Sequence, residues 1–399
     1  MGFTGIATAT VARRRRSGVP SAAVLRLLVT AFGLLLLAGV ALLVYAWLRP
    51  NRAAIDPRLA LEHWDVVSDG EHNSNTDMIE WRGDFLLVHD ARPYHLGTPD
   101  SRLLVRRSPD ARRWETLARL HVPGKDIRDP KLAVIEDRLF LYALPNSGTM
   151  ATPERTLLAT SEDGATWTPF EPVGPDGWLF WRPKSPDGGA TWYVPAYWKD
   201  HGEAILLRSS DGRRWERIAT IHRGAGNDET DIEFLPDGRL LATARLEVTP
   251  DSILGHADAG TAIVVAAPPY TEWDQTGFSQ VTRLDGPALF RLDDTIFAVA
   301  RHQPEPRGRL TRLGGALARK RTAIFRVEPE RLVHLTDLPS AGDTSYAGVV
   351  VRDGAVYVDY YTSRIDRDFP WLLGMFLRSD VRMARIPLDS LLALSRDTP

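Results

Sequence analysis

Side chains suited to acid–base and covalent chemistry stand at the ends of short apolar segments in the second half of the chain. Glu229 and Tyr346 each open such a segment, and Arg245 closes one. A carboxylate beside a phenol can remove the phenol's proton and so make it a nucleophile. A guanidinium group binds a carboxylate through two parallel hydrogen bonds. Brought together, these three side chains could carry out nucleophilic chemistry on an anionic ligand.

The segments that carry these residues belong to a sixfold repeat over residues 61–395. Each copy reads as a strand, a tight turn, a second strand that ends in polar groups, a connection and a third strand. The turns recur every 50 to 60 residues, at Gly83, Asp137, Gly188, Gly238, Asp294 and Gly354. Third strands are expected at residues 101–108, 155–161, 204–210, 261–267, 322–327 and 373–379. Four strands in about 50 residues is the blade period of a β-propeller, so the predicted fold is all-β, a six-bladed β-propeller.

The topology of a propeller predicts which of these residues lie together. Each inner strand begins at the rim where each second strand ends, because consecutive strands of a blade are antiparallel. Glu229 and Tyr346 stand at strand starts and Arg245 at a strand end, so all three are expected at one rim. The same rule adds further ionisable residues to that rim: Asp90, Arg92, Arg128, Asp129, Arg182 and Arg301.

Three of the third strands are followed by the pattern Ser-x-Asp-x-x-x-Trp. The copies begin at Ser108, Ser161 and Ser209 and end at Trp114, Trp167 and Trp215. A short Asp or Ser side chain can hydrogen-bond to the backbone of its own turn, and the tryptophan can pack between blades. The pattern therefore predicts a structural role, and not a chemical one.

These turns, the six blades and the rim residues together resemble the sialidase superfamily of Asp-box (BNR-repeat) propellers, over roughly residues 60–395. The segment ETDIEFLPDGRLLATAR at 229–245 is similar to the family's blade-four segment, and Ser345-Tyr346 is similar to the final-blade segment with its tyrosine nucleophile. The resemblance implies a retaining exo-glycosidase that removes an acidic or other glycan terminus. Tyr346 would be the nucleophile and Glu229 its base, with Arg245 and Arg301 binding the substrate. Sialidases depart in this way from the usual two-carboxylate scheme of glycosidases.

The sequence departs from the family pattern in the first blade. The arginine that the family has there, around residues 73–77, is absent, and Arg92, Arg128 or Arg182 would have to supply its charge. The general acid is expected in the loop after the second strand of this blade, where Asp90 and Asp100 are both candidates. Asp129 is a further candidate for substrate contact.

Two other functions remain open from the sequence. The propeller could bind a surface polysaccharide or a protein partner without turning it over. It could also hydrolyse glycans with paired rim carboxylates, such as Asp77, Asp129 and Glu229, in which case two carboxyl groups should lie about 5–9 Å apart.

The N-terminal region predicts a membrane anchor. Residues 27–48 form an uncharged run of 22 residues, long enough to cross a bilayer as one helix. Arg13 to Arg16 and Arg26 precede it, which favours a cytoplasmic N-terminus. The expected organisation is a cytoplasmic segment over 1–26, an uncleaved transmembrane signal-anchor over 27–48, a linker over 49–60 and an extracytoplasmic propeller over 61–395.

Composition excludes several classes of site. The chain has no cysteine, which removes disulfides, thiolate metal sites and cysteine nucleophiles. Residues 1–50 hold six of the 49 Lys and Arg residues and none of the 51 Asp and Glu residues, so the remainder is acidic. An acidic body argues against nucleic-acid binding. No His, Asp and Glu spacing resembles a zinc site, and we predict neither a metal nor a cofactor.

Overall fold

The computed structural model describes residues 21–150, 152–249, 253–305, 307–308 and 310–399. It divides into two units, Met1–Trp47 and Leu48–Pro399, and each is described here by itself.

The first unit contains one long helix, α1 (Ala22–Leu48). Its 27 residues span about 40 Å, and by length and composition this helix could cross a membrane. It begins five residues before the predicted span, because Ser21 caps it: the Ser21 hydroxyl accepts a hydrogen bond from the backbone N–H of Val24. Arg13 to Arg16, on which the predicted orientation depends, lie outside the described residues.

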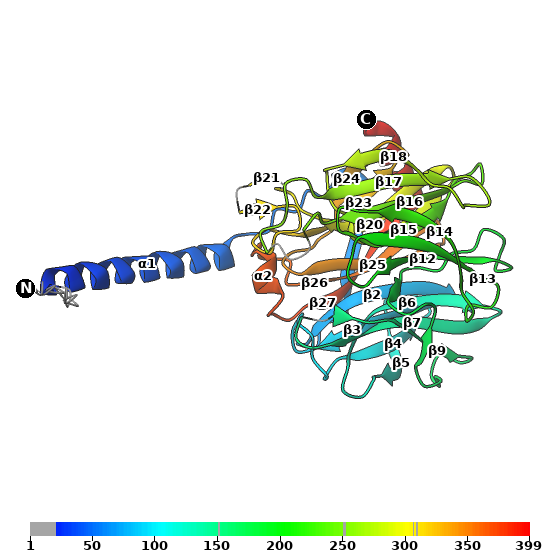
Figure 1. Ribbon diagram of the computed structural model, residues 1–399, viewed down its shortest axis with the longest axis horizontal. Helices are drawn as coiled ribbons and strands as arrows, with labels where there is room; N and C mark the ends of the chain where they lie inside the picture. Colours follow the sequence, from blue (N-terminus) through cyan, green and yellow to red (C-terminus); the bar gives the residue numbers. More distant parts are fainter. Residues whose placement is uncertain (1–20, 151, 250–252, 306, 309) are drawn as a thin grey trace, which may run out of the picture. The chain divides into compact units, whose positions relative to one another are not determined.

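The second unit is a β-propeller of six antiparallel sheets, or blades, which confirms the predicted fold class (Figure 1). Strands are given from the inner to the outer position of each blade. Blade one has β2 (His72–Trp81), β3 (Asp84–Arg92), β4 (Arg102–Ser108) and β5 (Glu115–Leu120). Blade two has β6 (Asp126–Ile135), β7 (Arg138–Ser147), β9 (Thr156–Ser161) and β10 (Glu171–Val173), with β8 (Thr152–Pro153) paired to β7. Blade three has β11 (Trp178–Phe180), β12 (Trp192–Trp198), β13 (Glu203–Ser209) and β14 (Glu216–Arg223).

The remaining blades follow the same order. Blade four has β15 (Asn227–Phe234), β16 (Leu240–Leu246), β17 (Gly260–Ala266) and β18 (Asp274–Ser279). Blade five has β19 (Asp285–Leu292), β20 (Thr295–His302), β23 (Arg321–Val327) and β24 (Leu332–Asp337). Blade six has β25 (Thr344–Arg352), β26 (Ala355–Thr362), β27 (Asp380–Pro387) and β1 (Glu62–Val67). Outside the blades lie η1 (Pro57–Leu59), the β21 (Arg307–Gly308) and β22 (Thr311–Arg312) ribbon, α2 (Trp371–Gly374) and α3 (Leu388–Asp397).

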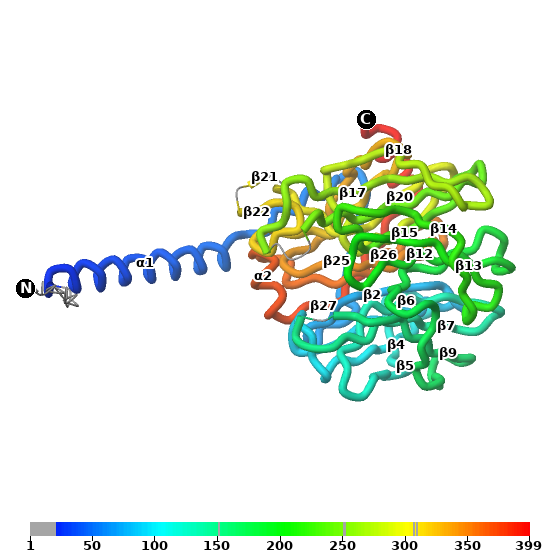
Figure 2. The backbone as a smooth tube through the Cα atoms, in the orientation of Figure 1, coloured from blue at the N-terminus to red at the C-terminus, as the bar shows by residue number. Residues whose placement is uncertain are grey.

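Blade six corrects one predicted strand. We expected its third strand at residues 373–379, but the third strand is β27, and α2 occupies the start of the predicted segment. The outer strand of this blade is β1, from the other end of the chain. The last blade thus lies next to the first one. Figure 2 shows the orange and red strands of blade six beside the blue strand β2 of blade one. Because β1 comes from the other end of the chain, its distance from β27 in the sequence does not follow the 50- to 60-residue repeat. The repeat therefore could not predict the strand that completes the ring.

Residues 49–60, predicted as a linker, are part of the propeller unit. The Asn51 side-chain amide donates to the carbonyl oxygens of Ser340 and Ile365, each at 2.9 Å. The backbone N–H of Ala54 donates to Asp337, and Leu59 is fully buried. This segment therefore packs on the body before β1 begins.

The Ser-x-Asp turns make the hydrogen bonds expected from their sequence. In the turn after β9, Asp163 Oδ1 accepts from the backbone N–H groups of Ala165 and Thr166 at 2.9 and 2.7 Å. The indole N–H of Trp167 donates to the carbonyl of Gly164 at 2.8 Å. The turns at Asp110 and Asp211 repeat this arrangement. These turns join third strands to fourth strands, at the rim opposite the predicted site.

Candidate active site

A β-bulge near the start of five inner strands shapes the predicted rim. The register slips in β2, β6, β15, β19 and β25, each time within the first few residues. Bulges re-aim side chains, and the bulged segments hold several residues with positive φ. Among these are Asp129 (52°), Gly286 (63°) and Tyr346 (51°). Glu229 lies in the bulged stretch of β15. The rim residues thus leave the regular alternation of the strands and gather at one end of the propeller.

Tyr346 and Glu229 are directly bonded. The Tyr346 hydroxyl donates to Glu229 Oε1. The other oxygen of Glu229 accepts from the backbone N–H of Gly286 at 2.6 Å and lies 2.6 Å from Arg245 Nη1. Burial and then the charge of Glu229 raise the pKa of Tyr346 well above its usual value, so the phenol keeps its proton until a reaction removes it.

Tyr346, Arg245 and Arg301 line one cavity with a volume of about 630 Å³. All six blades or their connections contribute to its wall. The other lining residues are His95, Met150, His201, Glu247, Thr249, Ile253, Gly255, Arg283, Gly314, Ala316, Trp371, Leu372 and Met375. Glu229 joins these three residues through its hydrogen bond with Tyr346. The structure therefore brings four of the predicted site residues together.

Arg245 is surrounded by carboxylates. Besides Glu229 it contacts Glu247, Asp228 at 3.1 Å and Asp285 at 3.3 Å. Burial alone would lower the pKa of Arg245, but these negative charges raise it well above its usual value. The guanidinium group is therefore a fixed positive charge that is already paired with carboxylates of this chain.

The other cavity arginines are also paired. Arg301 donates to the Thr344 carbonyl at 2.8 Å and lies 3.5 Å from Asp343. Its guanidinium carbon is 5.2 Å from the ring centre of Tyr346, which places a positive charge beside the phenol. Arg283 contacts Glu247 and Asp285, each at 3.0 Å.

His201 adds a cation to the cavity wall. Its Nδ1 lies 3.2 Å from Glu247 and its Nε2 3.7 Å from Asp228. Burial alone would lower the pKa of His201, but the charges of Asp228 and Glu247 raise it to about 9. His201 is therefore protonated at neutral pH.

Asp90, Arg92 and Asp100 do not line this cavity. Asp90 and Arg92 are fully buried and pair with each other at 2.9 Å, and Ser74 donates to Asp90. Arg92 also lies 3.4 Å from Asp126 of blade two, and neither Asp90 nor Arg92 is exposed, so the predicted roles in proton donation and substrate binding lack access to a ligand. Asp100 is exposed and lines a different, shallow pocket with Arg102, Arg119 and His121.

Arg128 and Arg182 are held by internal partners. Arg128 lies 2.6 Å from Asp126 and donates to the carbonyl of His95. Arg182 follows β11 and donates to Asp77 and to the carbonyls of Pro287 and Ala347, and so joins blade three to the inner strands β2, β19 and β25. Neither arginine lines the cavity. The guanidinium group of Arg182 donates to three residues of this chain.

Asp129 is half-buried at the bulge of β6, where Asn75 donates to its Oδ1 at 2.5 Å. Burial raises the pKa of Asp129 to about 6, with Lys131 and Arg128 opposing this and Glu229 adding to it. Its negative charge also contributes to the raised pKa of Tyr346. Asp129 is thus a carboxyl group near the Tyr346–Glu229 pair that holds its proton in mildly acidic solution.

Sequence reasoning missed several residues of the cavity. Arg283 and Glu247 stand beside strand ends at the predicted rim, so the topological rule could have found them. His95 and Trp371 come from irregular connections, for which the repeat carries no signal.

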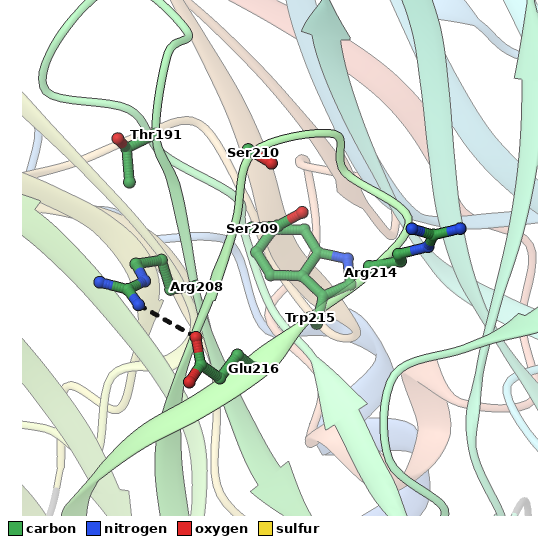
Figure 3. A pocket seen from close by; sticks show the side chains of 7 residues that line it. All are labelled: Thr191, Arg208, Ser209, Ser210, Arg214, Trp215 and Glu216. Carbon is green, nitrogen blue, oxygen red and sulfur yellow. Dashed lines mark hydrogen bonds and ion pairs between the residues drawn. The ribbon is translucent and has the colours of Figure 1, made fainter.

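A second cavity, of about 520 Å³, lies at the opposite rim of blade three (Figure 3). It is lined by the Ser209–Trp215 turn, with Arg208 paired to Glu216 at 3.0 Å. None of the ten predicted site residues is among its lining residues. It is a by-product of the turn that packs Trp215 between blades.

The architecture defines a class of fold, the six-bladed β-propeller of the sialidase type. Among solved structures, Trypanosoma rangeli sialidase in complex with sialic acid matches with a TM-score of 0.59 and 13% identity, over 87% of this chain and 61% of that one. Phage phi92 endosialidase matches with a TM-score of 0.58 and 11% identity, over 83% and 69%. A Dyadobacter fermentans protein of unknown function matches with a TM-score of 0.55 and 15% identity, over 82% and 99%.

At these identities the likeness establishes the fold. The chain spans 61% of the length of the Trypanosoma rangeli sialidase. By sequence, neither a protein-family model nor a curated protein matches the chain.

Proposed function

We propose that this protein is a retaining glycoside hydrolase that removes a terminal sugar from a glycan, with Tyr346 as nucleophile. The observation that carries the proposal is the hydrogen bond from the Tyr346 hydroxyl to Glu229 at the wall of a cavity lined by all six blades.

The residues divide the reaction as follows. The Tyr346 oxygen forms a bond to the anomeric carbon while its proton passes to Glu229, and the glycosidic C–O bond breaks. Asp129 donates its proton to the departing oxygen. Water then attacks the anomeric carbon from the same side as the departing group and gives a proton to Asp129. The bond between that carbon and the Tyr346 oxygen breaks, and Tyr346 recovers its proton from Glu229. Arg245 and Arg301 hold Glu229 and Tyr346 in position.

The charge of the cavity bears on the sugar. Arg245, Arg283 and Arg301 each contact carboxylates of this chain, so a sugar acid must compete with those carboxylates for the same donors. A neutral sugar hydroxyl can bind without displacing these carboxylates from the arginines. This balance favours a neutral or amino sugar over a sugar acid, whereas the resemblance to sialidases favours the acid.

We also propose that the protein is a single-pass membrane protein with a cytoplasmic N-terminus and an extracytoplasmic propeller. The apolar helix α1 and the arginines that precede it support this placement. The propeller would then act on glycans outside the cytoplasm.

The test is turnover of aryl glycosides of sialic, uronic, neutral and amino sugars by the full chain in detergent. We expect release of one sugar class with retention of anomeric configuration, which NMR of the first product reports. Tyr346→Phe should lower kcat by at least about 1,000-fold, because the nucleophile is lost. Tyr357→Phe is the matched control, since the Tyr357 hydroxyl meets Arg385 on the outer part of blade six.

Two results would contradict the proposal. Release that survives Tyr346→Phe would favour paired carboxylates. Absence of release from every sugar, with sugars still binding to the intact chain, would favour a propeller that binds glycans without cleaving them.

A further inference from the structure

Three side chains of the kinds that bind transition metals lie together beside the cavity. His72 is the first residue of β2, His95 follows β3, and Asp343 precedes β25. One ligand atom from each lies within 4.8 Å of the others. His72 and Asp343 are fully buried, whereas the His95 side chain is 18% exposed and lines the cavity with Tyr346.

The contacts of His72 call for a positive charge between it and Asp343. Its Nδ1 lies 2.7 Å from the carbonyl oxygen of Leu377, which can only accept, so Nδ1 carries a hydrogen. Its Nε2 lies 3.2 Å from Asp343 Oδ2 yet makes no hydrogen bond within the described part of the chain. In a neutral imidazole this Nε2 carries a lone pair and no hydrogen, and it is buried beside a carboxylate oxygen with which it makes no hydrogen bond. Two acceptors buried side by side away from water are unfavourable unless a cation lies between them.

The second histidine and the carboxylate are oriented toward the same point. Asp343 Oδ1 accepts from the Trp371 indole at 2.7 Å and from the Tyr361 hydroxyl at 3.0 Å, with Arg301 at 3.5 Å. Oδ2 is thereby turned to the two imidazoles, and His95 Nδ1 lies 2.6 Å from it. Metal-binding histidines and carboxylates are typically held in this way, by hydrogen bonds to the atoms that do not ligate.

We propose that His72 Nε2, His95 Nδ1 and Asp343 Oδ2 bind one divalent first-row transition metal ion such as Zn²⁺. Two imidazoles and one carboxylate leave an open coordination position, as in catalytic zinc sites. Because His95 lines the cavity, that position faces it and can take an oxygen atom of a bound ligand. The ion would also add positive charge to a cavity whose arginines are already paired. Metal binding does not depend on the proposed hydrolysis.

Two other groups of histidines and carboxylates are present in the described residues, and each also has a buried histidine nitrogen without a hydrogen bond, at His201 Nδ1 and His302 Nδ1. In the first group, Asp228 and Glu247 already contact the cation Arg245. The second group, with His334 and Asp337, does not line the cavity.

The test is metal binding by the full chain, purified in detergent with a histidine-free affinity tag. The chain is stripped with a chelator, incubated with Zn²⁺, freed of excess metal and assayed by mass spectrometry. We expect one zinc ion per chain, and a Zn²⁺ affinity weakened by at least about 100-fold in His95→Gln, since loss of a ligand exceeds the effect of an outer partner. His222→Gln is the matched control, because His222 is also half-buried but belongs to none of these three groups.

Cobalt tests the ligand set without any substitution. Co²⁺ added to the stripped chain should give a visible d–d absorption band that Zn²⁺ abolishes. The proposal is overturned if the stripped chain regains less than about 0.1 Zn²⁺ per chain, or if His95→Gln binds Zn²⁺ as tightly as the unaltered chain.

Discussion

At the residue scale, the number of polar and charged partners around each carboxyl group determines how that group is oriented and how readily it loses its proton. Glu229 is held by Tyr346, Gly286 and Arg245 at once, so its two oxygens have fixed directions. Asp129 has fewer opposing cations, and burial keeps its proton on to higher pH. Burial thus raises the pKa of one of the carboxyl groups near the phenol, and a carboxyl group with a raised pKa is suited to act as a general acid.

If Asp129 is the acid of the proposed hydrolysis, the activity must depend on pH. Its pKa is raised to about 6, so the proton needed by the departing oxygen is present below that pH and lost above it. We expect kcat/KM to fall about tenfold per pH unit above pH 6 for substrates with poor leaving groups. Asp129→Asn should lower activity on those substrates and spare activated aryl glycosides, which need no proton. A pH profile unchanged in Asp129→Asn but altered in Asp100→Asn would identify Asp100 as the acid.

At the element scale, the bulges in the inner strands position the residues of the candidate site. The bulge of β19 places Gly286 against the Tyr346 ring: a Cβ built on Gly286 would lie 2.6 Å from a ring carbon. The same residue has a φ of 63° and donates its N–H to Glu229. One glycine therefore leaves room for the phenol and orients its partner.

Replacing this glycine should disturb the site and the fold together. Gly286→Ala forces the Tyr346 ring to move, and overpacking of this kind costs about 1–3 kcal/mol. Gly238→Ala is the matched control, because Gly238 also has a positive φ (83°) but nothing within 4 Å of its Cβ position. We expect urea unfolding, followed by tryptophan fluorescence, to show the larger loss of unfolding free energy in Gly286→Ala. Equal losses in the two variants would mean that the ring is not held against Gly286.

At the scale of the whole molecule, the propeller is closed by its two ends. Strand β1 pairs with β27, so the ring is complete only when both termini of the body are in place. The segment that leads into β1 is itself hydrogen-bonded to the body at Asn51 and Ala54. Pairing of these distant strands therefore gives blade six its full set of four strands and joins the two ends of the ring.

The absence of cysteine from the chain allows a direct test of membrane orientation. Ser210→Cys places one thiol at an exposed position of the propeller, and Ser17→Cys places one ahead of α1. With the propeller outside the cytoplasm, a membrane-impermeant maleimide added to intact spheroplasts should label the first variant at least about tenfold more than the second. Lysis should make the two equal. The reverse pattern would place the propeller in the cytoplasm.

The sequence alone determined the six blades, the tight turns and the rim at which Tyr346, Glu229, Arg245 and Arg301 meet. These follow from local periodicity and from the antiparallel order of strands, which a single chain displays residue by residue. The repeat could not show that Arg92 and Arg182 face internal partners, because burial depends on the packing of neighbouring blades.

Only the tertiary structure decided the rest. It joined β1 to β27, brought Arg283 and His201 to the cavity wall, and placed His72 and His95 beside Asp343. These contacts join residues up to about 320 positions apart, and some come from irregular connections. Such pairings depend on how the ring closes and not on any local spacing, since the chain entropy lost in bringing distant residues together is recovered only in the complete fold.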